Sequence, residues 1–295
     1  MRVLGLGDNI IDRFVDRRVD YPGGNAVNVA VFSRRHGAEA AYLGVFGDDL
    51  LGKYLRRTLE AEGVATSHCQ VKQGNTGVSR LHVVDGDRTF LGWNGGGVTV
   101  SKPLTLDNEL LEYITAFDLA HSSVYSRMET QLPALYRTGA LISFDYSSEA
   151  EFRSDEYLNT TAPYIDLALV SCGSLSLDES KALLLRIAQA GAPLVVGTRG
   201  ESGSLFFDGQ HFLSHPAHLH TDHSALVDTM GCGDAFLSAT VVALFDHGWK
   251  RGRAPEPNEI QHALAAGAEA AKFQCTVEAA FAHPLCWSEE SQAVR

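Results

Sequence analysis

Apolar and polar residues alternate along the chain with two periods, that of short buried strands and that of helices. Short apolar runs, typical of buried parallel strands, cover residues 3–6, 40–45, 117–120, 141–145, 166–170 and 194–198. Between these runs, leucines recur at helical spacing in residues 50–59, and a further helix is expected from Asp178, as its N-cap, to Gly191. This order predicts an α/β fold with a mostly parallel, doubly wound sheet that binds ligands at the strands' carboxyl ends.

One stretch departs from that alternation. Residues 78–84 and 88–93 flank Asp85-Gly86-Asp87, which predicts an antiparallel hairpin closed by an Asp-Gly turn. With residues 13–20, the hairpin is expected to form a small sheet over the ligand site; the alternative is a plain edge hairpin. Arg88 is expected either to point into the ligand site or to pair across the strands.

A glycine-rich turn at residues 228–234 leads directly into a strongly apolar segment. Backbone amides at a helix start, here those of Gly231, Cys232 and Gly233, stabilise a phosphate or its transition state. Asp234 would repel a phosphate, so its expected role is to accept the proton of an attacking hydroxyl. The segment therefore predicts a phosphoryl-transfer site with Asp234 as the catalytic base.

A second glycine-rich motif lies near the N-terminus. Gly23 and Gly24 allow the backbone to approach a ligand closely, and Asn25 and Asn28 open a helix that ends before Gly37. Side-chain amides at the start of a helix suit a neutral polyol. These residues are predicted to bind the acceptor substrate.

Two aspartates follow the first predicted strand. Asp12 is expected to be a sugar ligand, because a carboxylate can accept hydrogen bonds from two neighbouring hydroxyls. Asp8 is expected either to meet a cationic part of the substrate or to be a solvated carboxylate at a strand end.

The two motifs together resemble the signatures of the PfkB-type carbohydrate kinases, the ribokinase family. Residues 228–239 are similar to the second signature, and the positions similar to the first are Gly23, Gly24, Ala26, Asn28, Ala30, Gly37 and Gly47. The resemblance implies a ribokinase-like three-layer fold in one domain, residues 1–295. It also implies a small β lid from about 13–21 and 75–98, and we expect a C-terminal tail at about 282–295.

The activity implied by the resemblance is ATP-dependent phosphorylation of a sugar's primary hydroxyl, with Mg²⁺. The likeness is strongest to members that act on fructoselysine, which implies a ketosamine phosphorylated at the sixth carbon. Fructose, ribose, 2-keto-3-deoxygluconate and nucleosides stay open as substrates, and so does a catalytically weak ligand-binding sensor. Thr198, Gly200 and Gly203 resemble the family's ATP-binding turn.

The chain departs from the family pattern at two places. Cys232 stands where the family has alanine or glycine, and residues 171–174 replace the Asn-x-x-Glu that organises Mg²⁺ in many members. The metal's protein ligands are therefore unknown, and ATP and water are expected to hold it. Residues 215–223 contain four histidines, His215, His218, His220 and His223, which either bind a transition metal or form a solvated polar loop.

Charge and cysteine content indicate which partners and which compartment to expect. A formal net charge of −12 argues against nucleic acid or an anionic membrane as a partner, and no apolar stretch reaches the length of a membrane span. The five cysteines have no Cys-x-x-Cys spacing, which is typical of reduced thiols in a cytoplasmic protein. The family's lid also joins subunits in many members, which implies a homodimer.

Two nucleotide-binding motifs are incomplete in this sequence. The string at residues 47–54 resembles a P-loop but has Tyr54 where the magnesium-binding hydroxyl belongs and two aspartates that would repel phosphates. Gly5 and Gly7 suggest a dinucleotide fingerprint, but the third glycine position is Ile10. Neither motif is expected to function here.

Overall fold

A nine-stranded sheet forms the centre of the protein in a computed structural model, which describes residues 1–84, 87–222 and 225–287. The strand order is β13-β12-β11-β10-β9-β8-β1-β4-β5. The pairs from β11 to β5 are parallel, and β12 and β13 add antiparallel strands at one edge. The bounds are β1 Arg2–Gly7, β4 Glu39–Gly47, β5 Gln70–Lys72, β8 Leu119–Ser123, β9 Leu141–Asp145, β10 Leu167–Ser171, β11 Leu194–Thr198, β12 Ser204–Phe207 and β13 Phe212–His215.

All six strands expected from apolar runs are present. The bounds of β9 and β11 agree with those predicted from the sequence, whereas β8 begins and ends later than the predicted residues 117–120. Its last three residues, His121, Ser122 and Ser123, are polar yet fully buried, so an apolar pattern could not include them. These residues bring hydrogen-bonding groups to the carboxyl end of the sheet.

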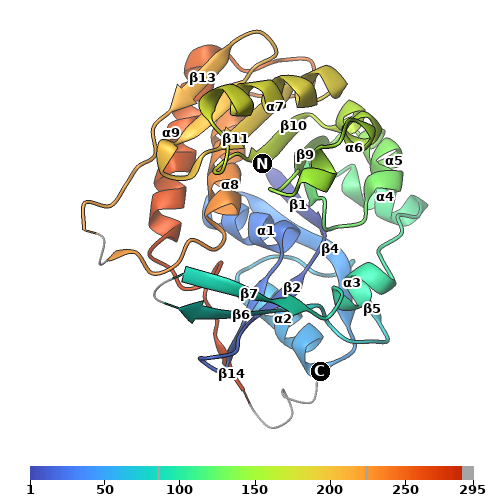
Figure 1. The fold of residues 1–295 in the computed structure, drawn as a ribbon. Coiled ribbons are helices and arrows are strands. Elements are labelled where there is room, and N and C mark those ends of the chain that lie inside the picture. Colours follow the sequence, from blue (N-terminus) through green and yellow to red (C-terminus); the bar gives the residue numbers. More distant parts are fainter. Residues whose placement is uncertain (85–86, 223–224, 288–295) are drawn as a thin grey trace.

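Helices cover both faces of the large sheet (Figure 1). Helices α1, α8 and α9 pack on one face, around Val3, Leu119 and Leu167, while α3 to α7 pack on the other, around Leu4, Ala120 and Ile142. The bounds are α1 Asn25–Arg35, α2 Leu50–Ala61, α3 Gly97–Ser101, α4 Asn108–Ile114, α5 Leu132–Tyr136, α6 Asp155–Thr161, α7 Leu177–Ala190, α8 Cys232–Asp246 and α9 Pro257–Gln274. The predicted three-layer α/β fold is confirmed.

The start of α7 differs from the sequence prediction. Its N-cap is Ser176, whose hydroxyl accepts from the Glu179 amide while the Glu179 carboxylate accepts from the Ser176 amide. Asp178 was therefore the wrong N-cap, because a serine followed three residues later by glutamate satisfies two free amides at once.

A second, five-stranded sheet lies apart from the large one, below it in Figure 1. Its order is β14-β3-β2-β6-β7, with bounds β2 Ile10–Phe14, β3 Val19–Gly23, β6 Val78–Val84, β7 Asp87–Trp93 and β14 Leu285–Cys286. The β6–β7 hairpin is antiparallel as predicted, and β2 pairs in parallel with β6. The expected Asp85-Gly86 turn lies outside the described residues.

The small sheet begins before residue 13, because β2 and β3 pair from Ile10 opposite Gly23 to Phe14 opposite Val19. A buried ion pair joins these strands, with Arg13 Nη2 2.7 Å from Asp20 Oδ2. Towards the C-terminus, β14 pairs with β3 at the edge of the same sheet. No helix in the described part of the chain has the length and apolar character needed to cross a membrane.

Candidate active site

Helix α8 presents its N-terminus and an aspartate at the same place. Its N-cap, Gly231, has a left-handed backbone (φ 74°), and a Cβ there would lie 3.1 Å from the Ala280 Cα. Glycine therefore allows the chain to turn sharply into α8. Asp234 lies in the first turn and is only 9% exposed.

The three amides expected to bind phosphate differ in their surroundings. The Cys232 amide donates to the Thr229 carbonyl at 3.3 Å, while in the described part of the chain the Gly233 amide meets no acceptor. Gly233 also has no atom within 4 Å of a Cβ position, so the space beside it is open. The Gly233 amide is therefore better placed than the Cys232 amide to receive an anion.

The Asp234 carboxylate is held by the two asparagines of the N-terminal motif. Asn25 Nδ2 donates to Asp234 Oδ1 at 2.7 Å, and Asn28 Nδ2 donates to Asp234 Oδ2 at 2.7 Å. Both come from α1, which packs against α8. The fold thus joins the two glycine-rich motifs at one carboxylate.

Asn25 continues this network to the carboxyl ends of β8 and β9. Its Nδ2 also donates to Asp145 Oδ2 at 2.8 Å, and its Oδ1 lies 2.6 Å from His121 Nε2. His121 is fully buried, and burial lowers its pKa to about 3, so the ring is neutral. Because the Asn25 oxygen must accept, the His121 Nε2 carries the proton and Nδ1 accepts from Ser143 Oγ at 2.8 Å.

The electrostatics of this site favour proton uptake by Asp234. Burial raises the pKa of Asp234 well above its usual range, the charges of Asp145, Asp8 and Asp12 raise it further, and the Asn28 hydrogen bond opposes the rise. Burial likewise raises the pKa of Asp145 to about 6, against hydrogen bonds from the Ser147 amide and Asn25. A buried carboxylate with a raised pKa is suited to general-base catalysis.

Asp8 is committed to contacts within the protein. Its oxygens accept from the backbone amides of Asn25 at 2.6 Å and Ala26 at 3.3 Å. They also accept from the hydroxyls of Ser123 at 2.9 Å and Ser126 at 2.7 Å. The carboxylate therefore stabilises the N-terminus of α1. It is 6% exposed, so the alternative of a solvated carboxylate is wrong, and the substrate contact stays a prediction.

Asp12 lies on β2 and faces the glycines before α1. A Cβ on Gly23 would lie 2.4 Å from Asp12 Oδ2, and a Cβ on Gly24 would lie 2.7 Å from the Asn9 Cα. Gly24 also has a φ of 113°, which side chains rarely adopt. Both glycines are therefore needed for Asp12 and α1 to come together, as the predicted sugar site requires.

A cavity of about 490 Å³ lies beside the start of α8. Its lining includes the residues expected to bind nucleotide and two of the three expected anion ligands: Thr198, Gly200, Gly203, Cys232 and Gly233. The sequence did not indicate its other walls, which include Leu219, Leu226, Phe236, Lys272 and Cys275. Apolar walls, a lysine and a helix N-terminus suit a nucleotide's base and phosphates.

The histidine-rich segment also borders this cavity. His218 Nδ1 lies 2.9 Å from Glu269 Oε2, His220 Nε2 lies 2.9 Å from the Lys272 carbonyl, and both residues line the cavity. In the described ranges, three potential metal-ligating side chains do not converge anywhere, and His223 lies outside those ranges. The segment is therefore a wall of the cavity and not only a solvated loop.

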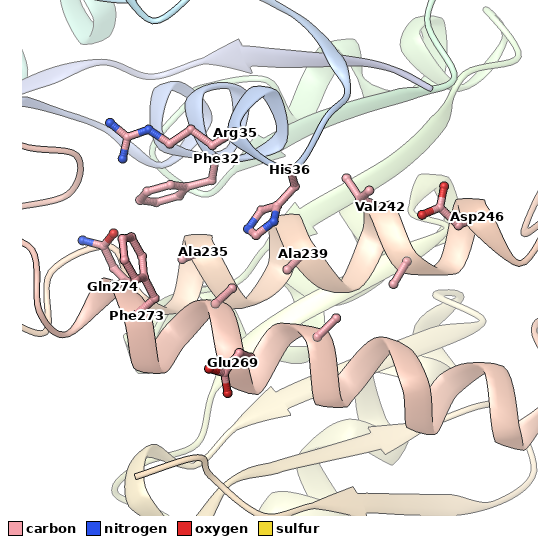
Figure 2. Close-up of a pocket in the computed structure, with 13 residues that line it drawn as sticks. Phe32, Arg35, His36, Ala235, Ala239, Val242, Asp246, Glu269, Phe273 and Gln274 are labelled. Carbon is pink, nitrogen blue, oxygen red and sulfur yellow. The ribbon is translucent and has the colours of Figure 1, made fainter. Parts of the chain in front are cut away.

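A larger cavity, about 630 Å³, opens between α1, α8 and α9 (Figure 2). Figure 2 shows Phe32 and Arg35 of α1 and the following His36 above it, and Glu269 and Phe273 of α9 below. None of the residues predicted to bind substrate or nucleotide lines it. The larger cavity is therefore not the one that the predicted nucleotide-binding residues line.

The sequence did not single out Asp145 or His121 as site residues. Asp145 ends a predicted strand of a parallel sheet, so the rule that ligands lie at carboxyl ends could have identified it. His121 gave no such signal, because a histidine near a strand end is more often solvated. The Arg88 backbone lies in β7, and its side chain is outside the described part.

Comparisons with known proteins agree with this geometry. The pfkB family carbohydrate kinase model matches residues 14–284. The chain is 33% identical over 285 residues to fructosamine kinase FrlD of Bacillus subtilis, covering 96% of this chain and 94% of that protein. It is 32% identical over 248 residues to fructoselysine 6-kinase of Escherichia coli, covering 84% and 88%. The structure of fructokinase with bound ATP from Xylella fastidiosa superposes with a TM-score of 0.76 at 18% identity, covering 95% and 94%.

Proposed function

Because this chain belongs to the PfkB family of carbohydrate kinases, we propose that its acceptor is a ketosamine, fructoselysine or a close analogue, phosphorylated at the sixth carbon. Two of the relatives it resembles are named as kinases of fructosamine and of fructoselysine. The general activity, ATP-dependent phosphorylation of a sugar, follows from membership of the family.

In the proposed reaction, Asp234 takes the proton of the sugar's primary hydroxyl as its oxygen attacks the γ-phosphate. The cavity beside α8 would hold the nucleotide, with Thr198, Gly200 and Gly203 along it and the Gly233 amide near the transferring group. Asp12, Gly23, Gly24, Asn25 and Asn28 would position the sugar. Mg²⁺ bound to ATP would neutralise phosphate charge.

The observation that carries the choice of a ketosamine is the charge of the acceptor site. Four buried carboxylates, Asp8, Asp12, Asp145 and Asp234, lie close enough that the charges of the other three raise the pKa of Asp234. A ketosamine carries a secondary ammonium next to the sugar, which would offset this negative charge. Fructose carries no such cation, so the clustered carboxylates favour the ketosamine as the acceptor.

An ADP-release assay over matched acceptors tests this proposal. Fructoselysine would be compared with an isosteric ether, in which oxygen replaces the amine nitrogen, and with fructose and ribose. A charge-assisted hydrogen bond is worth ~1.5–3 kcal/mol, so kcat/KM should be about 10- to 100-fold higher for the amine than for the ether. Equal turnover of the amine and the ether would reject ammonium recognition, and binding without ADP release would indicate a sensor.

A further inference from the structure

Two cysteines far apart in the sequence meet at the wall of the nucleotide cavity. Cys232 is the first residue of α8, and Cys275 directly follows α9. Their sulfurs are 3.2 Å apart, and neither cysteine is in a disulfide. Helices α8 and α9 run side by side (Figure 1), so the contact joins the ends of two long, packed elements.

These thiols are accessible from the cavity, and the pKa of Cys275 is lowered. Both are partly exposed and line the cavity of about 490 Å³. The hydrogen bond from Cys232 lowers the pKa of Cys275 to about 7, helped by His220 and opposed by burial and by Asp228. Burial instead raises the pKa of Cys69 to about 12. Thiolate is the reactive form, so Cys275 is the nucleophile of the pair.

A bond between these sulfurs would act on the catalytic segment. A disulfide requires the sulfurs to approach to about 2.05 Å from their present contact, which shifts the end of α9 relative to the start of α8. The Cys275 carbonyl already accepts from the amides of Val227 and Asp228, and Asp234 is two residues beyond Cys232. The link would therefore constrain both the loop before α8 and the first turn that carries the base.

We propose that Cys232 and Cys275 form a reversible oxidation site that switches off phosphoryl transfer, an inference that rests on the proposed kinase function. The oxidant is a peroxide. The Cys275 thiolate attacks a peroxide oxygen, the O–O bond breaks, and a sulfenic acid and hydroxide form. The Cys232 sulfur then attacks the sulfenic sulfur, loses its proton and releases water, so hydrogen peroxide and two thiols give a disulfide and two waters.

The experiment treats the purified, reduced full-length protein with hydrogen peroxide and then alkylates the remaining thiols. Peptide mapping should find Cys232 joined to Cys275. Turnover should fall about 10-fold or more and return after dithiothreitol, since small displacements of reacting groups have effects of that size. A bound non-hydrolysable ATP analogue should slow the loss, because it would occupy the cavity that both thiols line.

Two variants distinguish oxidation at this site from oxidation elsewhere in the protein. The turnover of each variant is measured before and after peroxide treatment. Cys275→Ser should resist inactivation, whereas Cys286→Ser, which removes an exposed cysteine on β14, should remain sensitive. Inactivation of Cys275→Ser at the wild-type rate, or the absence of the mapped disulfide, would overturn the inference. If the reduced protein phosphorylates no sugar, the proposed function fails. The inference is then tested by the affinity for a fluorescent ATP analogue, measured in the reduced and the disulfide form. Equal affinity in the two forms would overturn the inference.

Discussion

The neutral histidine behind the base is the residue whose role is least expected. His121 fixes the Asn25 amide by donating to its oxygen, so that the Asn25 nitrogen faces both Asp234 and Asp145. Without that donor, the amide could rotate and present its oxygen to a carboxylate. The histidine is therefore a positioning residue that acts on Asp234 through Asn25.

Replacing His121 by phenylalanine should lower kcat about 10-fold while changing KM for ATP little, because a lost buried hydrogen bond costs ~1–2 kcal/mol. Steady-state kinetics with each substrate varied, beside a thermal melt, would measure this. Val71→Ser, which changes an exposed apolar residue on β5 that the proposed reaction does not use, is the matched control. A purely structural role would lower the melting temperature and leave kcat of the folded enzyme unchanged.

The pH profile should report the raised pKa of Asp234. Only its deprotonated form accepts a proton, so kcat/KM should rise with pH through that pKa. Asp145→Asn removes the neighbouring charge that contributes most to the rise, so the acid limb should move to lower pH. Asp155→Asn, an exposed carboxylate paired with Arg186, should leave the limb in place. A limb that Asp145→Asn does not move would exclude this coupling.

At the residue scale, residue types and spacing predicted that Asp234, Asn25, Asn28 and the glycines before α1 belong to one site, and their catalytic and binding roles stay predictions. The structure shows what that reasoning could not. Asn25 and Asn28 contact Asp234 directly, and Asp8 accepts from the hydroxyls of two serines more than 100 residues away. Such long-range contacts leave no periodic trace in a sequence.

At the element scale, the start of α1 depends on a glycine that no other residue can replace. Gly24→Ala should lower the free energy of unfolding by about 3 kcal/mol or more, because both its φ of 113° and the approach to Asn9 oppose a side chain. Urea denaturation would measure the loss.

Gly139→Ala is the matched control for that substitution. Gly139 also has a positive φ, 90°, but no neighbour within 4 Å of a Cβ, so its variant should lose only ~1–2 kcal/mol. Equal losses at the two positions would show that contact with Asn9 does not constrain α1.

The strands and long helices were predictable because a parallel sheet buries both faces and leaves continuous apolar runs. The predictions that were wrong concern features set by local polar contacts, namely the polar end of β8 and the Ser176 N-cap of α7. The short strand β14 pairs with β3, which lies more than 260 residues earlier in the sequence. Two residues are too few to show a strand's alternation of apolar and polar positions.

At the scale of the whole molecule, the small sheet leaves one edge open. β7 is one of the two edge strands of this sheet in the described structure, with β14 at the other edge, and its Phe90, Leu91 and Trp93 are 63%, 46% and 52% exposed. Exposed apolar edge strands favour pairing with another chain. We expect this edge to join two copies of the protein, as the family resemblance implied.

Sedimentation velocity would test that expectation. Phe90→Asp combined with Trp93→Asp should shift the protein towards monomer, because charges on an edge strand oppose pairing. Phe273→Asp, which changes a phenylalanine of similar exposure on α9, should not. A wild-type monomer at high concentration, or dissociation by the α9 variant alone, would reject the lid as the interface.

The proposed reaction depends most on Asp234, and ADP release by Asp234→Asn with saturating ketosamine and ATP tests that role most directly. We predict a loss of about 100-fold or more in kcat, with ketosamine affinity and the unfolding midpoint nearly unchanged, because the amide cannot accept the hydroxyl's proton. Asp246→Asn, an exposed carboxylate at the end of the same helix, should keep full turnover. An Asp234→Asn protein that folds and retains wild-type turnover would contradict the assignment of the catalytic base.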